Sequence, residues 1–161
     1  MKKTALIMGS DSDLPVVEKA AAVLEKFGMP YTKHIMSAHR TPERAAEFAA
    51  HAHEQGYGVI VAFAGKAAHL AGVIAAHTCL PVIGVPIKGS DLGGLDALLS
   101  TVQMPSGVPV ACVAIDGGAN AAHLAARILA GEEPELFEKL LEEKRRMAAE
   151  VEAKEAKLNA V

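Results

Sequence analysis

Several residue types are scarce in this chain of 161 residues, which has no tryptophan, two tyrosines, four phenylalanines and two cysteines. So few aromatic side chains, without a basic stripe, argue against a nucleic-acid-binding protein. Both cysteines, Cys79 and Cys112, lie in apolar stretches, so we expect buried free thiols and no disulfide. No apolar run approaches the ~20 residues of a membrane-spanning helix. The sequence therefore predicts neither a nucleic-acid nor a membrane partner.

Residues 1–9 are basic and then apolar. The apolar part is too short for a signal peptide, and no small-residue cleavage pattern follows it. We therefore expect a cytoplasmic protein. Apolar residues make up 51% of the chain, which is enough to form a core and excludes global disorder.

Charge is unevenly distributed along the chain. Residues 131–161 carry nine of the 19 acidic and six of the 16 basic residues, which leaves ten of each in residues 1–130. A body with fewer charges than the ~25% of an ordinary domain suggests surface hidden by other subunits, so we predict a homo-oligomer. From Pro134 onward the pattern predicts one long charged helix. Its apolar stripe must dock on a neighbouring subunit or on the body's own edge, and we expect a solvated end beyond about Glu152. We expect a single domain over 1–161, which consists of a body (1–130) and this C-terminal helix (131–161).

Strand-like and helix-like segments alternate along the body. The expected strands cover residues 4–8, 30–36, 57–62, 81–85 and 108–115. The expected helices cover residues 14–27, 42–55, 67–77, 94–102 and 120–130. This alternation predicts an α/β three-layer sandwich with a five-stranded parallel sheet, flavodoxin-like or Rossmann-like. Ligands of such folds bind where the carboxyl ends of the strands meet the following helices, so the loops there are the candidates for a site.

The first candidate loop, GSDSD at 9–13, precedes a helix. Hydroxyls and backbone N–H groups at a helix N-terminus suit a phosphate, but two aspartates repel one. A mixed role fits better, in which the hydroxyls of Ser10 and Ser12 face a phosphate and a carboxylate such as Asp13 faces sugar hydroxyls. The alternative is that Ser12 or Asp13 only caps the helix.

The second loop, SAHRTP at 37–42, also precedes a helix, with Thr41 as the expected N-cap. Arg40 can bind a phosphate through its fork of donors, and His39 can give and take a proton near neutral pH. The alternative is a surface histidine beside a capping threonine.

The third loop, at 64–72, contains small residues that would let the backbone approach a flat ligand, together with His69 as a second candidate. Its Gly65-Lys66 pair resembles a phosphate-binding P-loop, but Ile60 and Ala67 occupy positions where that motif needs glycine and a hydroxyl residue. We interpret the glycine-rich segments 86–94 and 117–120 mainly as turns. The other histidines have no metal-ligand spacing, so we predict no metal.

Taken together, five ordered motifs resemble the PurE family of purine biosynthesis, the N5-carboxyaminoimidazole ribonucleotide mutases. The resemblance covers about residues 4–130. The motifs are GSDSD at 9–13, SAHRTP at 37–42, AAHL at 67–70, PVIGVP at 81–86 and QMP at 103–105.

This resemblance implies a homo-octamer with its sites at subunit contacts, and a ribonucleotide substrate with a 5′-phosphate and an aminoimidazole ring. It implies no metal, ATP or organic cofactor, and a possible functional partner in an ATP-dependent synthetase that makes the carbamate substrate. His39 would be the general acid and base. The residues implied to bind substrate are Ser10, Ser12, Ser37 and Arg40 at the phosphate, Asp13 at the ribose, and Gly65, Lys66, Ala67, His69 and Leu70 along the imidazole and carboxylate.

The family has a second branch, which carboxylates aminoimidazole ribonucleotide directly with carbon dioxide. Asp11, Arg40 and His69 resemble the mutase branch. Lys66 departs from it, because mutases usually have a small residue there, and Leu14 and Ala71 replace a common aromatic and a common proline. Direct carboxylation is therefore one alternative function, and a non-catalytic nucleotide-binding module of the same fold is another.

Overall fold

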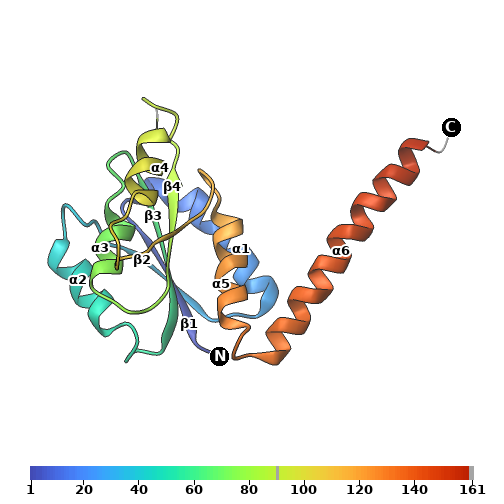
Figure 1. Cartoon of the computed structure of the whole chain (residues 1–161), viewed down its shortest axis with the longest axis horizontal. Helices are drawn as coiled ribbons and strands as arrows, with labels where there is room; N and C mark the ends of the chain where they lie inside the picture. The colour runs from blue at the N-terminus through green and yellow to red at the C-terminus, as the bar shows by residue number, and fades with distance from the viewer. Residues whose placement is uncertain (90, 160–161) are drawn as a thin grey trace.

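The structure of the protein is a computed structural model, and it describes residues 1–89 and 91–159. In this part of the chain, parallel strands form one sheet in the order β2-β1-β3-β4-β5 (Figure 1). The strands are β1 (Lys3–Met8), β2 (Tyr31–Ile35), β3 (Tyr57–Gly65), β4 (Val82–Ile87) and β5 (Ala111–Cys112). The helices are η1 (Asp11–Asp13, a 3-10 turn), α1 (Leu14–Phe27), α2 (Pro42–His51), α3 (Leu70–Ala76), α4 (Leu95–Val102), α5 (Gly118–Leu129) and α6 (Pro134–Asn159).

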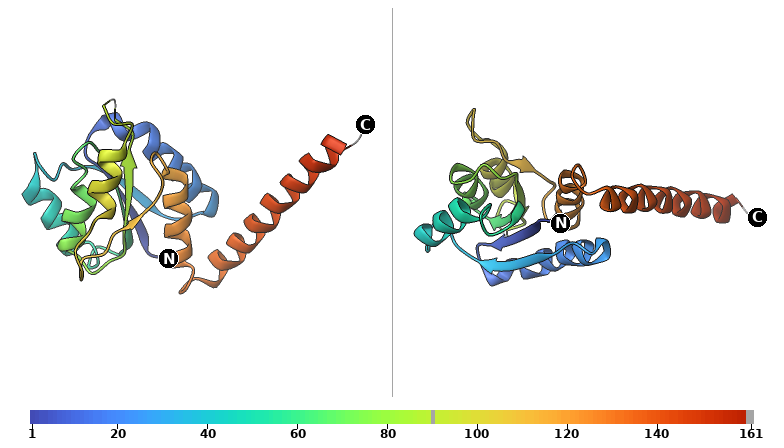
Figure 2. Two further views of the ribbon diagram at one scale, coloured as in Figure 1. Left: turned by 45° about the horizontal axis from the view of Figure 1, so that its top comes forward. Right: turned by 90° about the horizontal axis from the view of Figure 1, so that it is seen from below.

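Helices cover both faces of the sheet, as the two further views show (Figure 2). In β3, Val61 and Phe63 pack in the core beside α1 and α5, whereas Ile60 and Ala62 pack in the core beside α2 and α3. Successive strand residues point to opposite faces, so a strand buried on both sides must be apolar throughout. The predicted three-layer α/β sandwich is confirmed.

The order in which the chain adds strands to the sheet reverses beside β1. The chain passes from β1 outward to β2 and then returns to the other side of β1 through β3. This is the flavodoxin-like order, and its crevice lies between the carboxyl ends of β1 and β3. The loops after β1, β2, β3 and β4 therefore meet at one edge of the sheet.

Strand β5 is much shorter than the predicted 108–115. Val113 and Asp116 donate backbone hydrogen bonds to Gly84 and Pro86 of β4, so the chain still runs beside β4 after β5 ends. In a strand, the N–H and C=O groups of one residue point toward the same neighbouring strand. Because the carbonyl of Pro86 faces β5 and proline has no N–H, the ladder between β4 and β5 loses a hydrogen bond there. The sequence prediction overlooked this loss of a ladder bond. Helices α2 and α3 are also shorter than predicted.

Helix α6 is present as predicted and extends away from the body (Figure 1). Only its first turns are docked: Leu136 is fully buried, and the Nζ atom of Lys139 donates to the carbonyl oxygen of Phe27 at 2.9 Å. Further along, Met147 and Val151 are exposed in the single chain. The body's own edge thus holds the start of the helix and leaves the rest of its apolar stripe uncovered.

Both cysteines are free, but the expectation that they are buried is wrong. Cys79 is exposed in the turn before β4, and Cys112 is half-buried on the short edge strand β5. Among the described helices, none combines the length and the apolar character needed to cross a membrane.

Candidate active site

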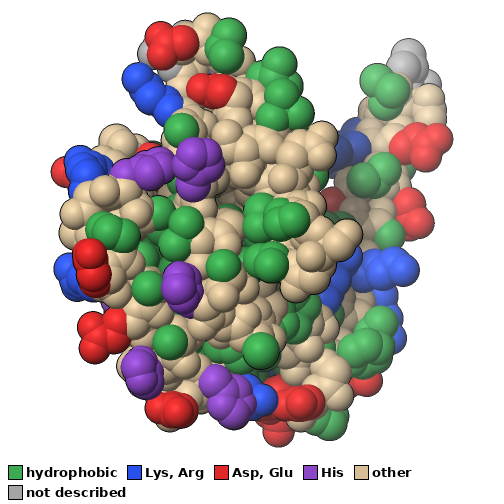
Figure 3. Space-filling view, turned by 60° about the vertical axis from the view of Figure 1, so that its left-hand side comes forward, with side chains coloured by type: hydrophobic (Ala, Val, Ile, Leu, Met, Phe, Trp, Pro, Cys, Tyr) green, Lys and Arg blue, Asp and Glu red, His purple; other side chains and the backbone are tan. Residues whose placement is uncertain are grey.

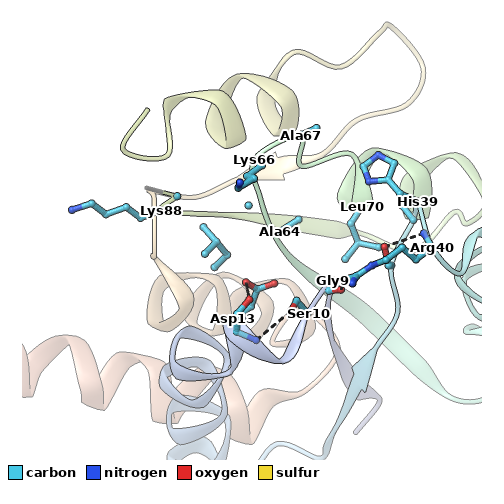
Figure 4. Close-up of a pocket in the computed structure, with 16 residues that line it drawn as sticks. Gly9, Ser10, Asp13, His39, Arg40, Ala64, Lys66, Ala67, Leu70 and Lys88 are labelled. Carbon is cyan, nitrogen blue, oxygen red and sulfur yellow. Dashed lines mark hydrogen bonds between the residues drawn. The ribbon is translucent and has the colours of Figure 1, made fainter. Parts of the chain in front are cut away.

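A cavity of about 520 Å³ opens at the carboxyl ends of β1, β2, β3 and β4 (Figure 4). Its walls come from the three loops singled out in the sequence and from the loop after β4. The residues that line it are Gly9, Ser10, Ser12, Asp13, Ser37, Ala38, His39, Arg40, Ala64, Gly65, Lys66, Ala67, Leu70, Ile87, Lys88 and Gly89. The structure thus brings together every predicted site residue except His69, which contacts the cavity through His39.

The first loop is organised by Ser10. Its Oγ atom accepts a hydrogen bond from the backbone N–H of Ser12 at 3.4 Å and donates to Asp11 at 3.1 Å. Ser12 does not cap a helix. Asp13 is the N-cap residue of α1, but its side chain makes no capping hydrogen bond, so capping does not account for its carboxylate. Their polar groups remain at the cavity wall.

Asp13 is the buried carboxylate of the site, with 6% of its surface exposed. The Ser12 hydroxyl donates to its Oδ1 atom at 3.3 Å, and its carboxylate points into the cavity (Figure 4). Burial raises the pKa of Asp13, and the hydrogen bond from Ser12 opposes that shift in part. A carboxylate in this position can accept hydrogen bonds from sugar hydroxyls.

The second loop is closed by Thr41. Its hydroxyl donates to the carbonyl of Ser37 at 3.0 Å and accepts from the N–H of Ser37 at 2.9 Å. Thr41 is the N-cap residue of α2, as predicted, but its side chain makes no capping hydrogen bond, because this loop holds its hydroxyl. The backbone N–H of Arg40 donates to Ser37 Oγ at 3.1 Å, and its Nη2 atom donates to the Gly9 carbonyl at 3.0 Å. Arg40 therefore connects the first two loops.

His39 and His69 form a hydrogen-bonded pair. The Nε2 atom of His39 lies 2.9 Å from Nδ1 of His69, and the rings meet nearly edge to face at 75°. Both side chains are exposed. Histidine side chains gather on the face of the molecule that carries α2 and α3 (Figure 3). In this pair one nitrogen must donate and the other accept, so the position of one proton is tied to both rings.

The third loop begins with a residue in an unusual conformation. Lys66 has a φ of 55°, in the left-handed region that non-glycine residues rarely adopt. Its Nζ atom lies 3.6 Å from Oδ2 of Asp91, in the loop after β4. Beyond it, Ala67 and the buried Leu70 complete this side of the cavity.

Sequence reasoning missed three lining residues that follow or end β4: Ile87, Lys88 and Gly89. The backbone N–H of Lys88 donates to Oδ1 of Asp116 at 2.9 Å, while its side chain points away from the cavity (Figure 4). The signal that could have found them was present, because their loop follows a strand at the same sheet edge. Its glycines favour the interpretation as a turn.

No group of three or more histidine, cysteine, aspartate or glutamate side chains in residues 1–89 and 91–159 is arranged to hold a metal ion. The donors that face the cavity are hydroxyls, one guanidinium, one ammonium and an imidazole. Such a set suits an anionic organic ligand with hydroxyl groups.

A flavodoxin-like sheet whose switch-point crevice is lined by hydroxyls, a guanidinium and a histidine is typical of enzymes that act on anionic small molecules. The chain belongs to the AIR carboxylase family, which it matches over residues 3–150. It is 61% identical to the N5-carboxyaminoimidazole ribonucleotide mutase of Pyrococcus horikoshii over 95% of this chain and 86% of that protein.

Other relatives differ in how much of their own length is matched. The mutase of Thermotoga maritima is 55% identical over the whole chain and 94% of its own length. The phosphoribosylaminoimidazole carboxylase of Saccharomyces cerevisiae is 60% identical, but only over 77% of this chain and 22% of that protein. The crystal structure of Treponema denticola PurE superimposes with a TM-score of 0.88 at 28% identity, covering 98% of both chains.

Proposed function

We propose that this protein converts N5-carboxyaminoimidazole ribonucleotide to 4-carboxy-5-aminoimidazole ribonucleotide. The observation that carries the proposal is its high identity to curated mutases over nearly the full length of both chains. The cavity also supports it, because hydroxyls, a guanidinium, a carboxylate and a histidine line it together.

The phosphate belongs near Arg40 and the hydroxyls of Ser10, Ser12 and Ser37. A second hollow of about 370 Å³ adjoins the cavity here and is lined by Ser10, Ser37 and Arg40 among others. A guanidinium together with hydroxyl donors is a strong arrangement for a phosphate dianion. Asp13 would then accept hydrogen bonds from the ribose, which places the ring toward the loop of residues 65–70.

His39 is proposed as the general acid and base. The carbamate carbon–nitrogen bond breaks, carbon dioxide leaves, and the amine nitrogen takes a proton. Carbon 4 of the ring then attacks the same carbon dioxide, and the proton on carbon 4 is removed. One imidazole can give the first proton and take the second, so no redox partner or ATP is consumed. Such proton transfer is typically worth about 10²–10⁴-fold in rate.

The proposed function includes an octameric assembly. The charge-poor body and the exposed apolar side chains of α4, Leu95, Leu99 and Val102, support burial of further surface between copies. A closed site would retain the carbon dioxide between the two steps. Because the substrate is a labile phosphorylated intermediate, we place the enzyme in the cytoplasm, supplied by an ATP-dependent carbamate-forming synthetase.

The test is a two-substrate assay without ATP. One reaction contains the carbamate ribonucleotide, and the other contains aminoimidazole ribonucleotide with bicarbonate. We expect rapid product only from the first. Efficient product only from the second would establish direct carboxylation instead, and product from neither would contradict both activities.

The role of His39 has its own test. His39→Asn should bind the ribonucleotide with nearly unchanged affinity and lose at least about 100-fold in kcat. Activity close to that of the wild type would overturn the assignment of His39. Arg40→Ala should instead weaken binding of the phosphorylated ligand, which separates the two roles.

A further inference from the structure

Lys66 adopts a conformation that costs stability. In the described residues, only Lys66 and Asp116 have a positive φ without being glycine. An L-residue in the left-handed region brings its Cβ close to the following carbonyl, which glycine would avoid. The Asp116 side chain has an evident structural use, because it accepts the hydrogen bond from Lys88. Lys66 needs a comparable reason.

The ion pair of Lys66 does not supply that reason. The Lys66 and Asp91 side chains are 73% and 71% exposed, and their nearest charged atoms are 3.6 Å apart. Solvent screens such a pair so strongly that it adds little to stability. The stem of Lys66 also passes Gly89, where an added Cβ would lie 3.9 Å from Lys66 Cγ. These contacts position the ammonium at the cavity wall without compensating for the strain.

The position of Lys66 suggests a ligand-binding role. Figure 4 shows Lys66 and Arg40 on opposite sides of the cavity. The adjoining hollow is lined by Arg40, Ser10 and Ser37 but not by Lys66. A ligand with its phosphate at Arg40 would thus present its other end to Lys66. In the proposed reaction, that end carries a carboxylate in both substrate and product.

We propose that Lys66 is a specificity-determining residue that binds the ligand's carboxylate in exchange for Asp91. This inference rests on the proposed function. In the free protein the Asp91 carboxylate pairs with the Lys66 ammonium, and the carboxylate of a bound ribonucleotide takes the place of Asp91. The cavity would then hold both carboxylated forms more tightly than the decarboxylated intermediate, aminoimidazole ribonucleotide.

The experiment compares dissociation constants of two ribonucleotides by titration calorimetry. The probes are the 4-carboxylated product and aminoimidazole ribonucleotide, which differ by one carboxylate. We expect Lys66→Met to bind the carboxylated ligand about tenfold more weakly, as suits one charge-assisted contact, and the other ligand within about twofold of wild type. Asp91→Asn should bind the carboxylated ligand a few-fold more tightly, because it removes the competing carboxylate.

Two further variants control for charge and strain. Lys19→Met removes an exposed charge on α1, outside the cavity, and should leave both constants unchanged. Lys66→Gly should lose the same discrimination while its thermal midpoint rises, because glycine relieves the left-handed conformation. Equal weakening of both ligands in Lys66→Met, or no change in either, would overturn the proposal.

The outcomes separate this inference from the function it rests on. If the wild-type protein converts the carbamate and Lys66→Met keeps the preference for the carboxylated ligand, only the role of Lys66 fails. If the wild-type protein neither converts the carbamate nor binds either ribonucleotide, the proposed function fails together with it.

Discussion

The Nε2 atom of His39 lies 2.9 Å from the Nδ1 atom of His69, which joins the loop after β2 to the start of α3. Because the two residues are 30 positions apart, this contact depends on the pairing of both strands with β1. The ring that we propose to transfer protons therefore has its orientation fixed by a second ring.

We predict that His69→Ala lowers kcat about 10- to 100-fold and changes KM less than about threefold. The loss follows from misorientation of His39, so the double variant with His39→Asn should be little worse than His39→Asn alone. Steady-state kinetics of the wild type, the two single variants and the double variant provide a double-mutant cycle. The control is His53→Ala, at an exposed position remote from the cavity. A raised KM with unchanged kcat would mean that His69 only binds substrate.

Asp13 links the site to stability. Burial raises its pKa above the ordinary 3.8, so over a window above pH 3.8 the unfolded chain loses this proton while the folded chain keeps it. The free energy of unfolding therefore falls as pH rises through that window and stays lowered above it. We predict that Asp13→Asn is more stable than wild type at pH 7 and loses that advantage below about pH 3.8.

Urea denaturation at several pH values would check this prediction. Asp13→Asn should also bind the ribonucleotide more weakly, because an amide is a poorer acceptor for ribose hydroxyls than a carboxylate. A variant that is less stable at pH 7 would show that the hydrogen bonds to the Asp13 carboxylate outweigh its burial.

Glu143 holds the first turns of α6 to the body. Two hydrogen bonds from Arg146, at 2.7 and 2.9 Å, and one from Lys26, at 2.6 Å, lower the pKa of Glu143 from 4.5 to about 2. Its contribution to the free energy of unfolding is therefore complete above pH 4.5 and is lost as pH falls toward 2. Lys26 and Arg146 are about half exposed, so solvent limits this contribution to about 1 kcal/mol.

We predict that Glu143→Gln lowers the stability at pH 7 by up to that amount and flattens the decline in stability between pH 4.5 and 2. Denaturant titrations at pH 7, 4.5 and 3 would measure both effects. Glu152→Gln, farther along the exposed part of α6, is the matched control. A decline as steep as that of wild type would show that other carboxylates dominate the acid response.

The architecture was predictable because the strands buried on both faces are apolar throughout and the helices alternate with them. The loops of the site followed from the same reasoning, since parallel strands place their carboxyl ends at one edge. The local roles of hydroxyls were not predictable. Thr41 is the N-cap residue of α2, as predicted, but its hydroxyl is bonded to Ser37 and not to the first turn of the helix. A hydroxyl near a helix N-terminus has several partners within reach, and tertiary geometry chooses among them.

The pairing of His39 with His69 also could not be read from the sequence, which offered each as a separate candidate. The same holds for Lys88 and Gly89, whose loop has the composition of an ordinary turn. The early end of β5 on its carboxyl side coincides with one missing N–H, that of Pro86 in the neighbouring strand. Each of these features arises from contacts between segments that are distant in the chain.

Gly84 belongs to one of the sequence motifs, and close packing explains why this position requires glycine. It lies in the PVIGVP segment, and an added Cβ would lie 2.2 Å from Cγ2 of Thr101 and 3.1 Å from Cγ1 of Val110. Thr101 is buried, and its hydroxyl donates to the carbonyl of Ala97 at 2.7 Å, so it has little freedom to move. We predict that Gly84→Ala lowers the free energy of unfolding by about 1–3 kcal/mol through overpacking.

A second substitution can relieve the same contact. Thr101→Ser removes Cγ2 and keeps the hydroxyl, so Gly84→Ala/Thr101→Ser should recover much of the stability lost in Gly84→Ala. The matched control is Gly72→Ala, where the nearest atom is the sulfur of the flexible Met104 side chain at 3.0 Å and the effect should be small. Urea denaturation of the wild type, Gly84→Ala, Thr101→Ser and the double variant measures the coupling free energy between the two positions. Additive losses in the double variant would mean that α4 shifts as a unit and that Thr101 is not what requires glycine at position 84.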